Sequence, residues 1–266
     1  MSLPLYQVDA FSPVPFRGNP AAVCLLDHPR PDAWMTALAA EMNLSETAFV
    51  LPEGTGYRLR WMTPKVEVRL CGHATLASAH ILFETSKAAP NDTLHFHTLS
   101  GELTARQVDG WIELNFPVKS VAASEPPAGL MEALGVQPVW VGRNEQTYLV
   151  EVEDEETVRS AQPNHAALAS LPLRYVLLTS RGRSGGAYDC VSRYFAPGAG
   201  IAEDPVTGSA HCYVIDYWGQ KLGKDQLLAY QASARGGELR LVRQGERVLI
   251  RGQAVTILRG ELLAAD

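Results

Sequence analysis

Short runs of β-branched and aromatic residues, broken by Pro, Asn, Asp or Gly, recur along the chain and predict strands. In the first half these runs are residues 57–62, 94–97, 102–107 and 111–116, and their counterparts in the second half extend through residues 247–257. Two segments, 74–83 and 211–218, are apolar on nearly every side, which is typical of helices buried inside a curled sheet. A further helix is predicted over residues 32–42, outside the sheet, with Asp32 near its N-cap.

An internal repeat relates the two halves of this pattern. Arg60-Trp61-Met62-Thr63-Pro64, Glu67 and Cys71-Gly72-His73-Ala74 recur as Arg193-Tyr194-Phe195-Ala196-Pro197, Glu203 and Thr207-Gly208-Ser209-Ala210. A second match keeps the same register, because residues 237–239 repeat residues 101–103 and lie as far from them as residue 207 lies from residue 71.

The repeat predicts an α+β fold of two pseudo-symmetric domains, each a curled, barrel-like β-sheet around a central buried helix. We place the domains at residues 1–118 and 119–266, joined where Ala, Ser and Pro accumulate, and the last strand can pack with the first domain. A functional site is expected between the two domains.

Composition narrows the class of protein. The 266 residues are 46% hydrophobic and 20% charged, as in ordinary globular proteins. With 23 basic and 29 acidic residues the net charge is −6, and basic residues do not cluster, so nucleic acid is not an expected partner. The N-terminus does not resemble a signal peptide, and the apolar runs are too short to span a membrane. Four isolated cysteines indicate reduced thiols, so a cytoplasmic protein is expected.

Both buried helices are predicted to begin at a glycine, Gly72 in the first half and Gly208 in the second. A helix N-terminus offers unpaired N–H groups and a partial positive charge, so these two positions favour a small anionic substrate such as a carboxylate. The alternative is that the glycines only permit tight packing of helix against strand. Their occurrence in register in both halves weakens that alternative.

Residues that are alike in both copies, such as Glu67 and Glu203, are candidates for the shared scaffold. Residues that differ can carry chemistry used once, and these are the pairs Val68/Asp204, Cys71/Thr207 and His73/Ser209. Asp204 precedes Pro205, which favours extended geometry and aims the carboxylate near the start of the second helix. It can accept a proton, hold a substrate donor, or simply cap that helix.

Glu46 opens an apolar strand after the outer helix. Desolvation beside an apolar cleft raises the pKa of a carboxyl group, which suits a general acid/base, whereas a solvated strand end would leave this Glu without a role. A match of residues 46–54 with residues 174–182 puts Arg174 at the equivalent place, so Glu46 is also an asymmetric position.

Other motifs are weak, and we predict neither a cofactor nor a metal. Residues 198–203 begin like a dinucleotide-binding loop but carry Glu203 where the third Gly belongs, and a phosphate-binding P-loop motif is absent from the sequence. His95 and His97 could share one strand face, yet no third ligand accompanies them. Ser209 does not lie in the G-x-S-x-G motif of hydrolases.

The motifs resemble the PhzF-like (phenazine biosynthesis) isomerase family within the diaminopimelate epimerase fold. The resemblance covers essentially the whole chain and rests on residues 7–11, 18–23, 44–49, 70–75, 203–210 and 233–237. It implies two similar domains, a homodimer, and an isomerase that moves a proton between carbons of a small carboxylated metabolite without metal or cofactor.

The resemblance also implies roles for individual residues. Glu46 would shuttle the proton, and His73, Asp204 and Ser209 would surround the substrate. True epimerases of this fold use two facing cysteines, whereas this chain has Cys71 in the first half and Thr207 in the second, which disfavours a two-thiol racemase. An amino-acid epimerase that uses Cys71 with another base, and a non-catalytic protein that binds a small anion, remain alternatives.

Overall fold

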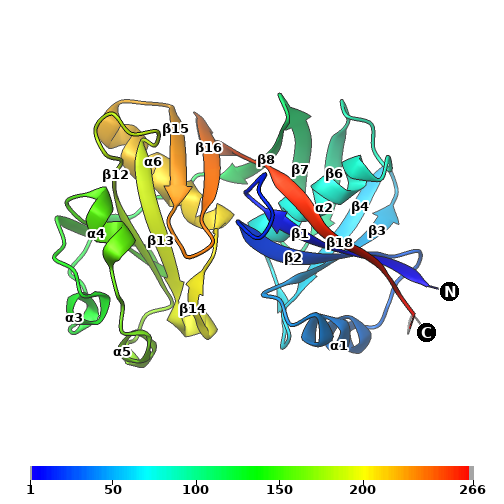
Figure 1. Ribbon diagram of the computed structural model, residues 1–266, viewed down its shortest axis with the longest axis horizontal. Helices are drawn as coiled ribbons and strands as arrows, with labels where there is room; N and C mark the ends of the chain where they lie inside the picture. The colour runs from blue at the N-terminus through cyan, green and yellow to red at the C-terminus, as the bar shows by residue number, and fades with distance from the viewer. Residues whose placement is uncertain (1, 264–266) are drawn as a thin grey trace. The chain divides into compact units, whose positions relative to one another are not determined.

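The computed structural model describes residues 2–263, which divide into two compact units. The first unit holds the residues up to Phe116 together with those from Leu249 onward, and the second unit is Pro117–Val248. The end of the chain therefore returns to the first unit, where the last strand, β18 (Ala254–Leu262), pairs antiparallel with the first strand, β1 (Leu3–Ala10) (Figure 1).

The sheet of the first unit continues from β1 and mixes parallel and antiparallel strand pairs. Its strands are β2 (Asn19–Leu25), β3 (Thr47–Glu53), β4 (Gly56–Met62), β5 (Glu67–Val68), β6 (Thr93–Thr98), β7 (Gly101–Val108) and β8 (Trp111–Pro117). Strand β2 is parallel to β3 and β4 is parallel to β6, while the pairs β1/β2, β3/β4, β4/β5, β6/β7 and β7/β8 are antiparallel.

Two helices pack on opposite faces of this sheet. Helix α2 (Gly72–Glu84) contacts β1, β2, β3, β7 and β18, and its apolar residues are buried on nearly all sides, as the sequence predicted. Helix α1 (Asp32–Met42) lies on the other face, where Met35, Leu38 and Ala39 join a buried cluster with residues of β1 to β4 (Figure 1). The curled sheet therefore wraps α2 and leaves α1 outside.

The second unit repeats this arrangement. Its strands are β9 (Ala122–Ala123), β10 (Trp140–Arg143), β11 (Thr147–Glu151), β12 (Tyr175–Arg181), β13 (Cys190–Ala196), β14 (Ile201–Asp204), β15 (Gln226–Gln231), β16 (Gly237–Gln244) and β17 (Arg247–Gly252), the last of which crosses the boundary between the units. Strands β11/β12 and β13/β15 are parallel and β12/β13 and β13/β14 are antiparallel, the same order as β2 to β6 in the first unit.

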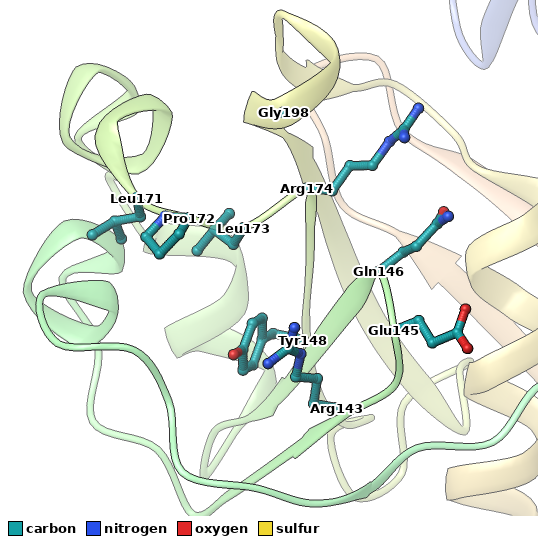
Figure 2. Close-up of a pocket in the computed structure, with 9 residues that line it drawn as sticks. All are labelled: Arg143, Glu145, Gln146, Tyr148, Leu171, Pro172, Leu173, Arg174 and Gly198. Atoms are coloured by element: carbon teal, nitrogen blue, oxygen red, sulfur yellow. The ribbon is translucent and has the colours of Figure 1, made fainter.

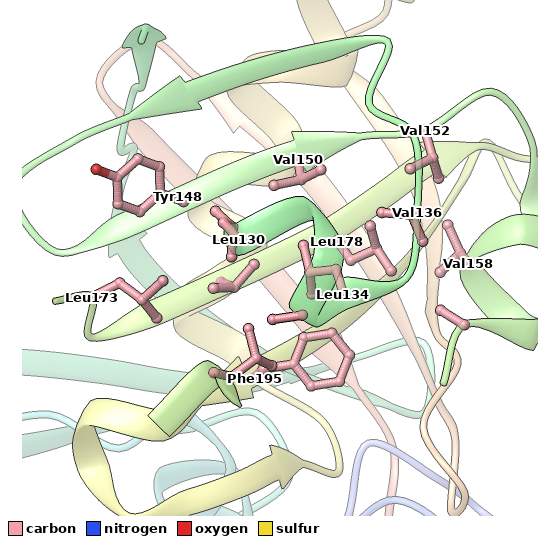
Figure 3. Close-up of a cluster of buried hydrophobic side chains, with 14 of the residues drawn as sticks. Leu130, Leu134, Val136, Tyr148, Val150, Val152, Val158, Leu173, Leu178 and Phe195 are labelled. Atoms are coloured by element: carbon pink, nitrogen blue, oxygen red, sulfur yellow. The ribbon is translucent and has the colours of Figure 1, made fainter. Parts of the chain in front are cut away.

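The central helix of the second unit is α6 (His211–Leu222), preceded by the 3-10 turn η2 (Gly208–Ala210). Three short helices, α3 (Leu130–Leu134), α4 (Glu155–Ser160) and α5 (His165–Ser170), cover the outer face of β11 to β13. Figure 3 shows the buried cluster beneath them, in which Leu130 and Leu134 of α3 pack against side chains such as Val150, Leu178 and Phe195.

The expected α+β class and the curled sheets around buried helices are confirmed, although the sheets curl without closing into barrels. Asp32 lies near the N-cap of α1, as predicted: the N-cap is Pro31 and Asp32 is the first helical residue, and its carboxylate accepts a 2.7 Å hydrogen bond from the Arg60 guanidinium.

Two further findings concern the predictions about membrane spans and cysteines. Within residues 2–263, every helix is too short or too polar to cross a membrane. Cysteines 24, 71, 190 and 212 are all buried, and no disulfide joins any two of them.

Candidate active site

The start of α2 brings three chemically active side chains of the first unit together. Cys71 is the N-cap of the helix in extended geometry (φ −143°, ψ 109°), Gly72 is its first residue, as predicted, and His73 follows within the first turn. Glu46 directly precedes β3, and its backbone oxygen accepts a hydrogen bond from the amide of Ala22 in β2. Glu46, Cys71 and His73 therefore converge where a strand begins beside the N-terminus of the buried helix.

The His73 imidazole lies between the other two groups. Its Nδ1 is 3.5 Å from Cys71 Sγ, and its Nε2 is 3.4 Å from Glu46 Oε2. The His73 side chain is 6% exposed and that of Glu46 is 14% exposed, and Glu46 Oε2, which faces His73, is buried. Glu46 and His73, both predicted as catalytic residues, therefore lie within contact distance of each other.

Burial sets the charge of His73. Desolvation lowers the pKa of its imidazole to about 3, because no surrounding water stabilises the charged form. At neutral pH the ring is therefore uncharged and carries a single proton. A neutral imidazole can donate a hydrogen bond from one nitrogen and accept one at the other.

The neighbours of His73 favour one tautomer. A carboxylate can only accept a hydrogen bond, whereas a thiol can donate one. Placing the ring proton on Nε2 gives Glu46 a donor and leaves Nδ1 to accept from the Cys71 thiol, so both 3.4–3.5 Å contacts become favourable. The nitrogen-to-oxygen separation exceeds an ordinary hydrogen bond by a few tenths of an ångström, as is common before a substrate tightens a site.

The same group has the composition of a metal site. One ligand atom from each of Glu46, Cys71 and His73 lies within 4.8 Å of the other two, among the residues that the structure describes. His95, which was weighed as a metal ligand with His97, instead lies 3.2 Å from the Glu102 carboxylate at the surface. The residues able to hold a metal are therefore not the pair that the sequence suggested.

At the corresponding corner of the second unit, Asp204 ends β14 and Thr207 precedes the turn η2. The Thr207 hydroxyl donates to the Asp204 carboxylate. Gln231, at the end of β15, ties the corner together: its side-chain oxygen accepts from the Thr207 amide at 2.8 Å, and its amide group donates to the Asp204 backbone oxygen at 2.7 Å. Asp204 is thus held at a defined place, while Gln231 occupies the amide that a capping Asp would bind.

The second helix start differs from the prediction. Gly208 opens the 3-10 turn η2, and the regular helix α6 begins only at His211. The cause is local: the Ala210 amide bonds back to the Thr207 oxygen in 3-10 fashion, and the buried His211 Nδ1 lies 2.8 Å from that same oxygen. Ser209 lies within the turn and is partly exposed.

The residues assigned to the scaffold do behave alike. Arg60 makes two hydrogen bonds to Glu67, at 2.8 and 2.6 Å, and Arg193 makes two to Glu203, at 2.7 and 2.8 Å. The strand pairing also places Val68 opposite Trp61 and Asp204 opposite Tyr194, so the Val68/Asp204 equivalence read from the repeat is confirmed.

A cavity of about 380 Å³ opens elsewhere in the second unit (Figure 2). Figure 2 shows Leu171, Pro172 and Leu173 on one side and the side chains of Arg174, Gln146 and Glu145 on the other. Arg174 directly precedes β12 as Glu46 precedes β3, so the second unit carries a guanidinium where the first carries a carboxylate. None of the predicted site residues lines this cavity.

Sequence reasoning missed two contributors. Gln231 was not predicted, because it lies in a strand far along the chain from Asp204 and the repeat gives no signal for it. Cys71 was considered only as a base for an epimerase, whereas its contact with His73 Nδ1 gives it a second role. The Cys-x-His spacing at a helix start was the available signal, since residues i and i+2 can meet where a helix begins.

Comparison with known proteins agrees with this architecture. The family model described as "Phenazine biosynthesis-like protein" matches residues 8–260. An "uncharacterized isomerase" of Halalkalibacterium halodurans is 50% identical over 264 residues, which cover 99% of each chain. The crystal structure of a phenazine biosynthesis protein of the PhzF family from Enterococcus faecalis superposes with a TM-score of 0.93 at 42% identity, covering 98% of this chain and 99% of that one.

A more distant structure, a hydroxyproline epimerase of Agrobacterium vitis, has a TM-score of 0.63 at 13% identity over 100% of this chain and 93% of its own, which shows a shared fold alone. The family match and the close relatives cover nearly the whole chain. This chain therefore belongs to the phenazine biosynthesis-like protein family and is an isomerase of that family.

Proposed function

We propose that this isomerase works without a cofactor and moves a proton between carbons of a small carboxylated metabolite, with Glu46 as the acid/base. The observation that carries the proposal is the contact of 3.4 Å between Glu46 Oε2 and Nε2 of the buried, neutral His73. A carboxylate beside a neutral hydrogen-bond donor can accept a proton and return it without a separate partner.

In this mechanism the Glu46 carboxylate removes a proton from one carbon and becomes a neutral carboxylic acid. The electron pair left behind moves into the conjugated substrate, and Glu46 then returns the same proton to a different carbon. His73 donates from Nε2 while Glu46 is charged and holds the carboxyl group in place during both transfers. Charge is balanced at every stage, because the negative charge passes from Glu46 to the substrate and back.

The first turn of α2 supplies N–H groups for the substrate carboxylate. The amides of Gly72 and its neighbours at the start of the helix precede the first intrahelical bond, which the Thr75 amide donates to the Cys71 oxygen at 3.2 Å. Such groups together with the helix dipole stabilise an anion. In the second unit, Gly208 and Ser209 are proposed to bind the substrate, and Asp204 to hold a polar group of it.

The test is deuterium exchange after removal of metals. The protein is treated with EDTA and dialysed, its metal content and absorbance spectrum are recorded, and it is incubated with a metabolite extract in heavy water. Mass spectrometry should then detect deuterium in a carboxylated product. Exchange that returns only on addition of a metal or an organic cofactor contradicts the proposal, and binding of a carboxylate without any exchange indicates an anion-binding protein.

An amino-acid epimerase using Cys71 is the second candidate. It is favoured by the 3.5 Å contact of Cys71 Sγ with His73 Nδ1, which holds the thiol in a fixed position at the start of the helix. It lacks a second thiol at the matching helix start, where Thr207 donates its hydroxyl to Asp204. The nearby Cys212 is fully buried, and desolvation raises its pKa to about 12. Loss of activity on alkylation of Cys71 by iodoacetamide would support this candidate.

A further inference from the structure

The three side chains at the start of α2 are those of a thiolate-containing metal site. Thiolate, imidazole and carboxylate are the ligands of protein-bound zinc, and three protein ligands leave a fourth position open for water or substrate. Here Cys71, His73 and Glu46 each offer one ligand atom within 4.8 Å of the others. Hard cations such as Mg²⁺ and Ca²⁺ prefer oxygen ligands alone, so the thiol and imidazole select for a softer ion.

Two contacts of this group each have the spacing of a ligand pair on such an ion, and they involve different nitrogens of His73. Zinc bonds of about 2.3 Å to sulfur and about 2.0–2.1 Å to nitrogen, at a tetrahedral angle, put the two ligand atoms roughly 3.5 Å apart. Cys71 Sγ and His73 Nδ1 are 3.5 Å apart. A nitrogen and an oxygen on one zinc ion lie roughly 3.4 Å apart, which is the distance between His73 Nε2 and Glu46 Oε2.

Only one nitrogen of His73 can bind the ion, so the ligand on the far side of the ring has to approach. The ligand atoms lie within 4.8 Å, and a tetrahedral pair lies roughly 3.4–3.6 Å apart, so the approach is on the order of 1 Å. Among the described residues Nε2 is the nitrogen without a hydrogen bond, and it already lies 3.4 Å from Glu46 Oε2, so the ion binds there and the Cys71 thiol is the ligand that approaches, by rotation of its side chain.

A second observation points to a ligand at this place. His73 is 5% exposed, and its Nε2 makes no hydrogen bond within the described part of the chain, although a buried polar atom of this kind ordinarily has a partner. A buried nitrogen without a hydrogen bond, beside a thiol and a carboxylate, is a position that a bound ion would fill.

We propose that Cys71, His73 and Glu46 bind one zinc-class divalent ion, and that this ion inhibits the isomerase by occupying Glu46. On binding, the Cys71 thiol releases its proton to solvent and a metal–sulfur bond replaces the sulfur–hydrogen bond, with no oxidation or reduction. The inhibitory part rests on the proposed function of Glu46, whereas the binding part does not.

The experiment titrates zinc chloride into EDTA-treated, dialysed protein by calorimetry, and cadmium chloride into the same protein while the near-ultraviolet thiolate-to-metal absorption is recorded. One ion per chain and a thiolate band are expected. Cys71→Ala should abolish the band and weaken zinc binding by at least about 100-fold, since loss even of an outer-shell partner costs about 10–100-fold. Urea unfolding of the variant confirms that it is folded.

Two matched controls separate this site from others. Cys24→Ala removes another buried cysteine of the same unit, and His95→Gln removes the surface histidine beside Glu102; both should leave zinc binding unchanged. Absence of stoichiometric binding, or binding that survives Cys71→Ala, overturns the proposal.

Inhibition is measured separately as deuterium exchange. Saturating zinc should suppress exchange and EDTA should restore it, while exchange that persists in zinc-saturated protein overturns the inhibitory role. If the protein never exchanges deuterium but still binds zinc through Cys71, the metal site stands and the proposed function has failed.

Discussion

The strand-to-helix corners of the two units share a scaffold and differ in their reactive groups. In each unit an Arg of the central strand makes two hydrogen bonds to a Glu of the following short strand, Arg60 to Glu67 and Arg193 to Glu203. Beyond that pair, the first unit presents a buried thiol and imidazole beside Glu46. The second unit presents Asp204, whose carboxylate accepts from the Thr207 hydroxyl and whose backbone oxygen accepts from the Gln231 amide group.

The difference shows that the two copies of this corner have diverged in their reactive groups while they keep the same scaffold. The second corner is hydrogen-bonded throughout, with Gln231 bridging Thr207 and Asp204, and such a network holds its members in place. The first corner keeps a buried imidazole nitrogen without a hydrogen bond and a partly exposed carboxylate next to it. We infer that the first corner carries out the proton transfer and that the second corner positions the substrate.

Glu46→Gln should have the largest effect. The amide keeps the shape and a hydrogen-bonding oxygen but cannot carry a proton to carbon, so turnover should fall by about 10²–10⁴-fold while substrate binding persists. Deuterium exchange and calorimetry with the substrate measure the two quantities. Glu53→Gln, at the other end of β3, is the matched control and should leave turnover unchanged. Turnover of Glu46→Gln within a few-fold of wild type would remove Glu46 from the mechanism.

Asp204→Asn should have a smaller and different effect. The Thr207 hydroxyl can still donate to the amide oxygen, so the corner persists, but the charge that holds a polar group of the substrate is lost. KM should rise and kcat should fall, together by about 10–10²-fold in kcat/KM, below the effect of Glu46→Gln. If KM stayed constant and exchange vanished as fully as in Glu46→Gln, the roles of the two carboxylates would be exchanged.

Glu67→Gln and Glu203→Gln should both reduce stability and spare catalysis. Each removes a charged partner from an arginine, a change of about 1–2 kcal/mol in the free energy of unfolding once partial exposure is allowed for. Glu203→Gln should cost more, because Arg193 is 11% exposed and Arg60 is 25% exposed. Urea unfolding measures the difference, and kcat should stay within a few-fold of wild type in both variants. A large loss of kcat in either would contradict a purely structural role.

A separate effect on stability is expected from mild acid. Burial lowers the pKa of His73 to about 3 and that of His211 to about 4, both below the ordinary value of 6.5. Between about pH 6.5 and pH 4 these histidines take up protons in the unfolded chain but not in the folded chain. The free energy of unfolding is therefore highest above about pH 6.5 and declines as the pH falls toward 4. The free energy of unfolding should be lower at pH 5.5 than at pH 7.5.

His211→Asn tests the contribution of one of these rings. Asparagine retains an N–H donor for the Thr207 oxygen but does not titrate, so the difference in stability between pH 7.5 and pH 5.5 should shrink in this variant. Carboxylates with lowered pKa values, such as Asp154, titrate below this window and do not contribute. An unchanged pH dependence would show that His211 is not responsible for it.

Sequence periodicity and the internal repeat determined the α+β class, the outer helix over residues 32–42 and the scaffold roles of Glu67 and Glu203. They also identified the reactive candidates Glu46, Cys71 and His73, because asymmetry between two aligned copies can be read directly from residue types. These features depend on local pattern, and periods of 2 and 3.6 residues are visible in the sequence itself.

Tertiary structure alone decided which groups meet. Glu46 and His73 are far apart in the chain, and their 3.4 Å contact depends on how β3 packs beside α2. Gln231 reaches Asp204 only because β15 lies parallel to β13. Asp32 pairs with Arg60, and Gly208 lies in a 3-10 turn, because each backbone or side-chain group takes a hydrogen-bond partner that folding brings near. Distances between side chains from separate elements follow from packing, which no local pattern encodes.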